Sequence, residues 1–428
     1  MGKTLIRRFR TDVGQFVAFS RQYVQWRHII TTIPPYFDSQ ERLVIVPCDP
    51  WTVGGSRGDE AMLMAVMQQY RLINPQVPII VVVSDESGCE YVRNLPIENI
   101  IALPVWNGSY PLSRIYHGVL AQKPSHVVLL GADCMEGHYS PLLSLILLNL
   151  HDLFSRTPGI ESRLLGFSFN DKPYRPLYFA FDHIADTTII NLRDSVSYDR
   201  FRRKVSIHAG LVADAAFMLR PDYYFEGFKR LESWIRVRRE IGKRIVIGFN
   251  FHPMLRNYSG VEEIKSDALV LAHNLERILQ ERPDVDFVLI PHDNRSRLTD
   301  NLMLDVIYSY LCQKQWQNRL YYDAEVYRAP QLKAICSLVD GLISSRMHLA
   351  IAALGQGKSV MAASYQGKFE GLFQHFELPE TYLLNPDAFI SDAMISVFYN
   401  YLNHLEELTN QVKKMLPSVV RLSQKNLL

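Results

Sequence analysis

Short β-branched apolar runs alternate with helical segments along most of this chain, and this alternation restricts the folds that it can adopt. The apolar runs occupy residues 42–48, 77–86, 98–105, 125–133, 163–169, 187–194, 244–251, 285–293, 341–345 and 358–364. Helical segments are expected between several of them, at 59–73, 111–120, 141–154, 266–283, 298–314 and 329–339. Continuous apolar runs are typical of strands buried on both faces. The sequence therefore predicts an α/β fold with parallel sheets.

The alternation weakens between Pro221 and Lys243, where a polar and aromatic stretch is predicted to be a helix. A chain of 428 residues is long enough for two or three domains. We therefore predict two Rossmann-like domains facing a cleft, at 43–220 and 221–390, with final helices at 391–428 that are candidates to cross back to the first domain. Ligands of such sheets bind beyond the carboxyl ends of the strands, so functional residues are sought there.

Residues 1–42 form a separate basic and aromatic segment, which ends at Pro34-Pro35 because proline cannot continue a helix. It contains Arg7, Arg8, Arg10, Arg21 and Arg27 together with Phe9, Phe16, Phe19 and Trp26. The interpretation that we favour is a helix packed on the body of the protein with its arginines in solvent. The alternative is peripheral contact with an anionic membrane surface.

The amino-acid composition restricts the kinds of partner and the cellular compartment that are expected for this chain. A net charge of +2 gives no strong positive field, so no nucleic-acid partner is expected. Five cysteines include no Cys-x-x-Cys pair, which argues against a zinc site or a disulfide framework and favours a reducing compartment. The longest apolar stretch, 141–154, is shorter than a span of about 20 residues. We expect a cytoplasmic protein, with the inner face of a membrane and a homo-oligomer left open as alternatives.

The stretch 340–360 reads as strand, turn, helix, glycine turn and strand, and it places charged groups at a helix start. Ser345, Arg346 and His348 fall between the strand and the helix. A helix N-terminus offers free N–H groups, and a guanidinium can bind a carboxylate or a phosphate with two hydrogen bonds. The pattern predicts an anion site. The alternative reading makes Ser345 an N-cap and Arg346 a solvated residue.

Other candidates follow strands or lie in glycine loops. Tyr365 and Lys368 come after the next strand, and Lys368 could supply a second cationic contact. Arg193 follows a strand and His292 ends another, although each could instead be structural. His252 also ends a strand.

In the N-terminal half, the loop 53–59 contains Gly55 and Asp59 but lacks the Walker spacing and the three-glycine dinucleotide fingerprint. Asp59 reads as a helix-start charge, with contact to a sugar hydroxyl as the alternative.

Taken together, these blocks resemble the polysaccharide pyruvyltransferase family. The resemblance covers roughly residues 43–378, and its specific part is Ser345-Arg346-Met347-His348, Gly357, Tyr365, Lys368 and Gly371. Weaker blocks agree in order: Gly58-Asp59, Arg193-Asp194-x-x-Ser197, Asp214, and His292-Asp293 followed by Asp300. The chain departs from the family at 129–140, where relatives are often rich in glycine, and at 166–173. Both departures lie in the half expected to bind the acceptor.

The resemblance implies a GT-B-like enzyme that transfers pyruvate from phosphoenolpyruvate to a sugar, as a ketal or an enol ether. It implies that His348 is the first candidate for the catalytic acid and His292 the second. The donor would be bound by Ser345, Arg346, Lys368, Arg193 and Tyr365, and the acceptor by Gly55, Asp59 and Asp133. Asp133 and Asp59 are also candidates for the base. No step demands a metal or a cofactor.

Two other functions stay open. A GT-B glycosyltransferase that uses a nucleotide sugar would share the architecture, with Glu370 as a weak candidate for a ribose contact. A non-catalytic subunit of a polysaccharide-assembly complex is the second alternative. In the favoured reading, the acceptor is a glycan or a lipid-linked sugar used in exopolysaccharide biosynthesis.

Overall fold

The computed structural model describes residues 2–108, 112–293, 298–364 and 367–428. These residues form two compact units, and the chain passes between them more than once. Unit 1 contains Met1–Gly55, Val66–Ala215 and Leu422–Leu428, and unit 2 contains Ser56–Ala65 and Ala216–Arg421. A short piece near the N-terminus therefore belongs to unit 2, and the C-terminal tail belongs to unit 1.

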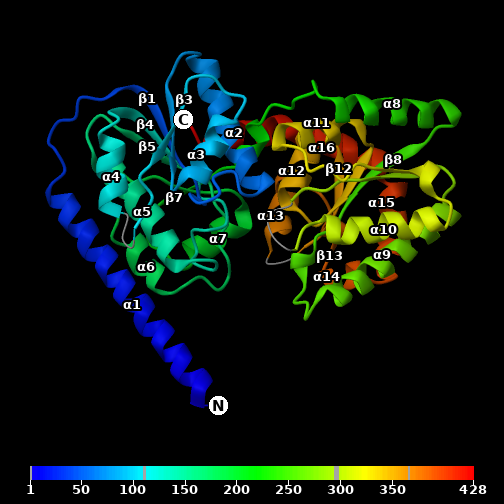
Figure 1. The fold of residues 1–428 in the computed structure, drawn as a ribbon, viewed down its shortest axis with the longest axis horizontal. Helices are drawn as coiled ribbons and strands as arrows, with labels where there is room; N and C mark the ends of the chain where they lie inside the picture. Colours follow the sequence, from blue (N-terminus) through cyan, green and yellow to red (C-terminus); the bar gives the residue numbers. More distant parts are fainter. Residues whose placement is uncertain (1, 109–111, 294–297, 365–366) are drawn as a thin grey trace. The chain divides into compact units, whose positions relative to one another are not determined.

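Unit 1 is built on a five-stranded parallel sheet in the order β3-β2-β1-β4-β5 (Figure 1). Its strands are β1 (Gln40–Val46), β2 (Ile79–Val83), β3 (Ile100–Pro104), β4 (Pro124–Leu129) and β5 (Glu161–Leu164). β2 is buried along its whole length, as its unbroken β-branched sequence predicts. A second parallel pair, β6 (Ile190–Leu192) and β7 (Ala209–Leu211), follows in the same unit.

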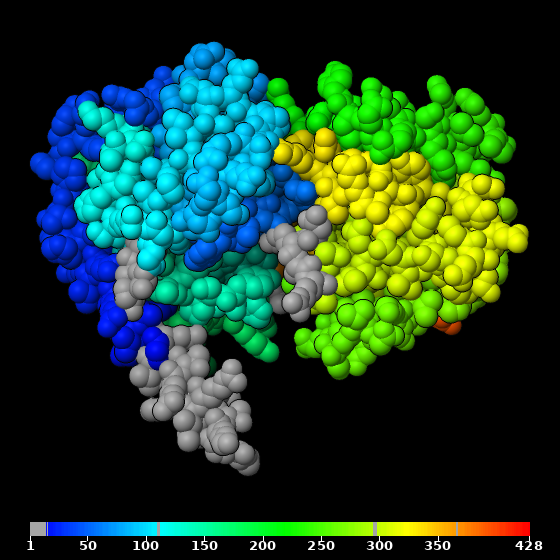
Figure 2. Space-filling view, in the orientation of Figure 1, coloured from blue at the N-terminus to red at the C-terminus, as the bar shows by residue number. Residues whose placement is uncertain are grey.

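The helices of unit 1 are α1 (Gly2–Thr31), α3 (Glu86–Arg93), α4 (Leu112–Leu120), α5 (Pro141–Arg156), α6 (Pro176–Phe181) and α7 (Ser195–Arg202), and α2 (Arg57–Ile73) runs through both units. The C-terminal part of α1 packs on α5. There Trp26 is buried and donates a hydrogen bond from Nε1 to Asp152 at 2.8 Å. The described part of α1, in dark blue, lies at the surface of unit 1 (Figure 2).

Unit 2 contains a six-stranded parallel sheet in the order β10-β9-β8-β11-β12-β13. Its strands are β8 (Ile245–Asn250), β9 (Val285–Leu289), β10 (Leu320–Tyr322), β11 (Gly341–Ser344), β12 (Ser359–Ala363) and β13 (Leu383–Leu384). Its helices are α8 (Glu226–Ile241), α9 (Val261–Glu281), α10 (Asn301–Gln313), α11 (Ala329–Leu338), α12 (Met347–Leu354), α13 (Lys368–Phe376), α14 (Pro386–Phe389), α15 (Ala393–Asn403) and α16 (Leu405–Gln424), whose last residues belong to unit 1. Short 3-10 turns lie at Ala215–Met218, Pro253–Leu255, Gln317–Arg319 and Glu380–Tyr382.

The secondary structure differs from the expectation in a few places. The strands β7, β10 and β13, which contain two or three residues each, were not predicted. The helix predicted to begin at Ser266 begins at Val261 instead. Ser266 therefore lies inside that helix, and the next residue, Asp267, accepts hydrogen bonds from Arg256 and Tyr258. Within the described residues, no helix combines the length and the apolar character needed to cross a bilayer.

Candidate functional site

The candidate residues of unit 2 gather at the point where the order of its sheet reverses. β8 and β11 are neighbours, and the chain leaves β8 toward β9 on one side and continues from β11 to β12 on the other. His252 follows β8, and Arg346 follows β11. His292 follows β9, next to β8. In open parallel sheets, this crevice beyond the carboxyl ends is where ligands bind.

Arg346 is held by two acidic side chains. Its Nη2 and Nε lie 2.5 and 3.1 Å from Oδ1 of Asp300, and its Nη1 lies 3.4 Å from Oδ2 of Asp293. Asp300 is completely buried, and its Oδ2 accepts hydrogen bonds from Nδ2 of Asn250 (2.9 Å) and from the backbone N–H of His292 (3.0 Å). One buried carboxylate thus fixes residues that follow three different strands.

Burial keeps two histidines of this cluster neutral. It lowers the pKa of His292 well below its usual value, and the positive charge of Arg346 lowers it further. Burial also lowers the pKa of His252 well below the usual value, again with Arg346 as the next cause. Nδ1 of His292 is buried and has no hydrogen-bond partner among the described residues. A neutral imidazole with an unsatisfied ring nitrogen can accept or donate a hydrogen bond to a ligand.

The hydroxyls at the start of α12 are used by the protein itself. Oγ of Ser345 accepts a hydrogen bond from the backbone N–H of His252 at 2.9 Å, and Oγ of Ser344 accepts one from the backbone N–H of Arg346 at 3.0 Å. Arg346 is the N-cap residue of α12, and its side chain makes no capping hydrogen bond. The alternative reading in which Ser345 is the N-cap is therefore wrong, and the Ser345 hydroxyl instead links the end of β11 to the end of β8.

Lys368 lies at the start of α13, where it is 9% exposed. Its positive charge also contributes to the lowered pKa of His252, which places it near the cluster. Tyr365 lies outside the described residues.

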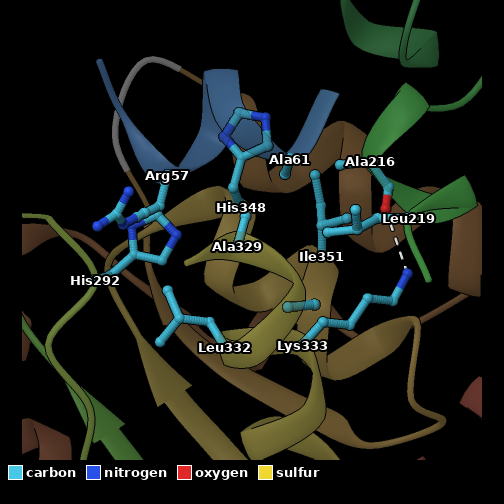
Figure 3. A pocket seen from close by; sticks show the side chains of 11 residues that line it. Arg57, Ala61, Ala216, Leu219, His292, Ala329, Leu332, Lys333, His348 and Ile351 are labelled. Atoms are coloured by element: carbon cyan, nitrogen blue, oxygen red, sulfur yellow. Dashed lines mark hydrogen bonds between the residues drawn. The ribbon is translucent and has the colours of Figure 1, made fainter. Parts of the chain in front are cut away.

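His348 packs directly against the first turn of α2 (Figure 3). A Cβ atom at position 58 would lie 2.3 Å from Nδ1 of His348, so any residue other than glycine would require the imidazole to move. His348, Arg57 and His292 line a small cavity within unit 2. The cavity leaves about 10 Å³ for the centre of a water-sized sphere, which is room for about one water molecule.

The first turn of α2 is fastened to unit 2 by Glu60, which is buried. Its Oε2 lies 3.0 Å from Nη1 of Arg57 and accepts a hydrogen bond from the backbone N–H of Ala329 at 2.9 Å. Nη2 of Arg57 also donates to the carbonyl of Val326 at 3.1 Å. These contacts position Arg57 and Gly58 beside His348. Asp59 is half-buried in the same turn, and it groups with unit 2.

Lys333 lines the same cavity from α11 and is buried. Its Nζ donates to the carbonyls of Phe217 (3.0 Å) and Ala216 (3.3 Å). Burial lowers the pKa of Lys333 to about 8. The sequence analysis overlooked Lys333 and Arg57. Two signals in the sequence could have identified them. Lys333 lies within an apolar helical run, and Arg57 lies at a helix start, where the helix dipole disfavours a positive charge.

Arg193 belongs to unit 1 and is buried there. Its Nη1 lies 2.8 Å from Oδ2 of Asp214, and its Nε donates to Oγ of Ser168 at 2.7 Å. Burial alone would lower the pKa of Arg193, but the charges of Asp214, Asp133 and Asp194 outweigh that effect and raise it. Asp194 is the N-cap of α7. Arg193 is therefore a permanently charged group held by acidic neighbours.

The other predicted residues of unit 1 lie where the order of its sheet reverses, between β1 and β4. Gly55 is in the loop after β1, and Asp133 is half-buried after β4. Ala132, beside Asp133, has a φ of 48°. Glycine adopts this left-handed conformation without strain, whereas alanine does so at a cost.

The structure thus places the predicted residues in two groups. Ser345, Arg346, His348, His292, Lys368 and Asp59 belong to unit 2, whereas Arg193, Gly55 and Asp133 belong to unit 1. Sequence reasoning missed the pairing of Arg346 with Asp300.

Comparisons with known proteins agree with the predicted fold and resemblance. A family model described as polysaccharide pyruvyl transferase matches residues 57–367, whereas no curated protein matches significantly. Several solved structures are similar, among them three enzymes. A UDP-N-acetylglucosamine 2-epimerase has 13% identity and a TM-score of 0.50, with 91% of this chain and 95% of that chain covered.

A ugt transferase from Siraitia grosvenorii in complex with UDP has 12% identity and a TM-score of 0.52, with 91% of this chain and 98% of that chain covered. An alpha,alpha-trehalose-phosphate synthase (UDP-forming) from Burkholderia vietnamiensis has 11% identity and a TM-score of 0.50, with 90% and 96% covered. At these identities the likeness shows the fold alone. It confirms the predicted α/β class with Rossmann-like units of GT-B type.

Proposed function

The chain belongs to the polysaccharide pyruvyl transferase family, and we propose that it transfers pyruvate from phosphoenolpyruvate to a sugar of a polysaccharide or of its lipid-linked precursor, forming a pyruvate ketal. The observation that carries the proposal is the cluster of His252, His292, Arg346, His348 and Lys368 in unit 2. It combines cationic and neutral donors at the end of a parallel sheet where anionic ligands bind. Phosphoenolpyruvate has a phosphate and a carboxylate close together and needs such donors.

In this proposal unit 2 binds the donor and unit 1 binds the acceptor. Arg346 is fixed by Asp300 and Asp293, so it presents a preoriented guanidinium rather than a mobile charge. Lys368 supplies a second positive charge, beside that of Arg346, to the proposed donor site. Arg193 is the corresponding charged group of unit 1, and Asp133 is a candidate to accept a proton from a sugar hydroxyl.

The reaction requires one proton to be added and two to be removed. Protonation of C3 of phosphoenolpyruvate makes C2 electrophilic, and a sugar hydroxyl forms a bond to C2 and loses its proton. A second hydroxyl then displaces phosphate from C2, and its proton leaves with the phosphate or with a base. We assign the proton delivered to C3, or the stabilisation of the departing phosphate, to His348. His292 stays neutral, so we assign it a hydrogen bond to the donor.

None of the five cysteines, all of which lie in the described residues, forms a disulfide, and we place this reaction in the reducing cytoplasm.

The first test measures donor binding without any acceptor. Isothermal titration calorimetry with phosphoenolpyruvate should show binding to the wild-type chain. His348→Gln should retain that binding within a few-fold, because its proposed role belongs to the transition state. His273→Gln is the matched control, because His273 is exposed on α9 in the same unit. No binding of phosphoenolpyruvate at millimolar concentration would overturn the proposal.

The second test measures turnover on a panel of glycans. Phosphate release and a pyruvate-sized increase in the mass of the acceptor should appear together, and His348→Gln should lower kcat by about 10²–10⁴-fold. Parallel reactions contain UDP-sugars in place of phosphoenolpyruvate. Glycosyl transfer without phosphate release would identify a glycosyltransferase. Absence of both reactions, together with absent donor binding, would indicate a non-catalytic subunit.

A further inference from the structure

One face of α1 carries exposed apolar side chains on the side opposite its contact with α5. Gln22, Trp26 and Ile29 form the buried side. Phe16 is 70% exposed, and Val24, eight residues further along, is 65% exposed. Residues at i and i+8 lie on one side of a helix. The exposed face is therefore apolar where a helix packed on a protein would normally be polar.

The apolar pattern continues beyond the described side chains. Val17 is also exposed, at 43%, and lies seven residues before Val24. In the sequence, the same helical spacing occurs toward the N-terminus at Ile6, Phe9 and Val13. An apolar spacing of this length predicts a surface that covers several turns rather than a single residue.

The same helix carries a larger net positive charge than the whole chain. α1 has six basic residues and one acidic residue, a net charge of +5, whereas the whole chain carries +2. The remainder of the chain therefore carries a net charge of −3. Arg21 and Arg27 are exposed beside the apolar face. The helix is consequently both the most basic part of the chain and an amphipathic surface.

We propose that α1 binds the surface of an anionic lipid bilayer. A basic amphipathic helix with an apolar, aromatic face lies in the membrane interface, with its apolar side in the headgroup region and its cations near lipid phosphates. Charge favours this occupant over a second copy of α1, because two helices of +5 would repel each other. No described helix can cross a bilayer, so α1 lies on the surface instead. The inference does not depend on the proposed transferase activity.

The experiment is flotation of the full chain with vesicles in a density gradient. Vesicles of phosphatidylcholine alone are compared with vesicles of three parts phosphatidylcholine and one part phosphatidylglycerol. The chain should float with the second kind and not with the first. Added salt should weaken the binding, because it screens the attraction.

Two variants separate the charged contribution from the apolar one. Replacing Lys3, Arg7, Arg8 and Arg10 with glutamine should lower the partition coefficient by roughly 600-fold, since each of the four basic residues contributes about five-fold near an anionic surface. Phe16→Ser with Val24→Ser should lower it at least ten-fold. Leu72→Ser with Ile73→Ser is the matched control, because these side chains are 50% and 80% exposed on α2 of the same unit. This control should float like the wild type.

Three outcomes would overturn the inference. The first is equal flotation with both kinds of vesicle, and the second is equal loss of binding in the control. The third is absence of flotation together with self-association that the Phe16 and Val24 changes abolish, measured by analytical ultracentrifugation. That result would make a second copy of the chain the occupant.

Discussion

Replacing Gly58 with alanine should lower turnover although it improves an isolated helix. Alanine is favoured over glycine inside a helix by about 1 kcal/mol. In unit 2, however, the new Cβ would lie 2.3 Å from Nδ1, 2.7 Å from Cε1 and 2.8 Å from Cγ of His348. Ordinary contacts begin at 3.4 Å, so the imidazole must move by about 1 Å. A misplacement of this size can lower a rate by about 10²-fold.

The assay compares phosphate release, phosphoenolpyruvate affinity and thermal unfolding of Gly58→Ala with those of the wild type. We expect kcat to fall by about 10²-fold, with a smaller change in donor affinity. Gly14→Ala is the control, because a Cβ at that position of α1 would meet nothing within 4 Å. It should gain about 0.5–1 kcal/mol and keep the wild-type kcat on a soluble acceptor. A Gly58→Ala variant with raised stability and wild-type kcat would refute the claim that His348 is fixed against α2.

Four further predictions concern the free energy of unfolding, measured by urea denaturation. Arg346→Met should lower the free energy of unfolding by about 3–5 kcal/mol, because it leaves Asp300 buried without its ion-pair partner. Adding Asp300→Asn should restore much of this stability, and equal losses in the single and double variants would contradict the pairing. Burial lowers the pKa of His151 to about 4, so the folded state binds a proton more weakly than the unfolded state and stability falls as pH drops from about 6.5 toward 4. His151→Gln should therefore lose about 2 kcal/mol less than the wild type between pH 7.5 and pH 5, and an unchanged slope would exclude His151 as the cause. Ala132→Gly should gain up to about 1 kcal/mol by relieving its positive φ, and a loss would show that the conformation carries no strain. Gln22→Leu should gain about 1–3 kcal/mol, because neither amide atom of the buried Gln22 has a hydrogen-bond partner among the described residues, and a loss would point to a bound water there.

The positions of the site residues along the strands could be predicted from the sequence. Continuous β-branched runs identify buried parallel strands, and the carboxyl ends of such strands lie along one edge of a sheet. His252, His292 and Arg346 each follow such a run, so their common location required no knowledge of side-chain packing. The predicted start of α9 at Ser266 was wrong, because the helix begins at Val261 and the side chain of Asp267 binds Tyr258 and Arg256.

The partners of these residues could not be predicted, because they come from distant parts of the chain. Arg346 pairs with Asp300, which lies 46 residues earlier in the sequence. His348 packs against Gly58, and these two residues lie near opposite ends of the stretch that the family model matches. Local patterns contain no information on such contacts, which arise only when the sheets and helices pack. For the same reason, the sequence predicted a ligand-binding role for Arg346 but not its ion pairs with Asp293 and Asp300.

The C-terminal residues Leu422–Leu428 belong to unit 1, so unit 1 depends on a segment that is synthesised late. Asn426 accepts a hydrogen bond from the backbone N–H of Gly166 and donates one to the carbonyl of Ala213, and Ser423 donates one to the carbonyl of Asp214. These contacts complete unit 1 beside the aspartate that binds Arg193. They cannot form while the tail is still inside the ribosome. Unit 1 therefore combines early and late segments of the sequence, and nascent chains halted before residue 422 would lack these three hydrogen bonds beside the aspartate that pairs with Arg193.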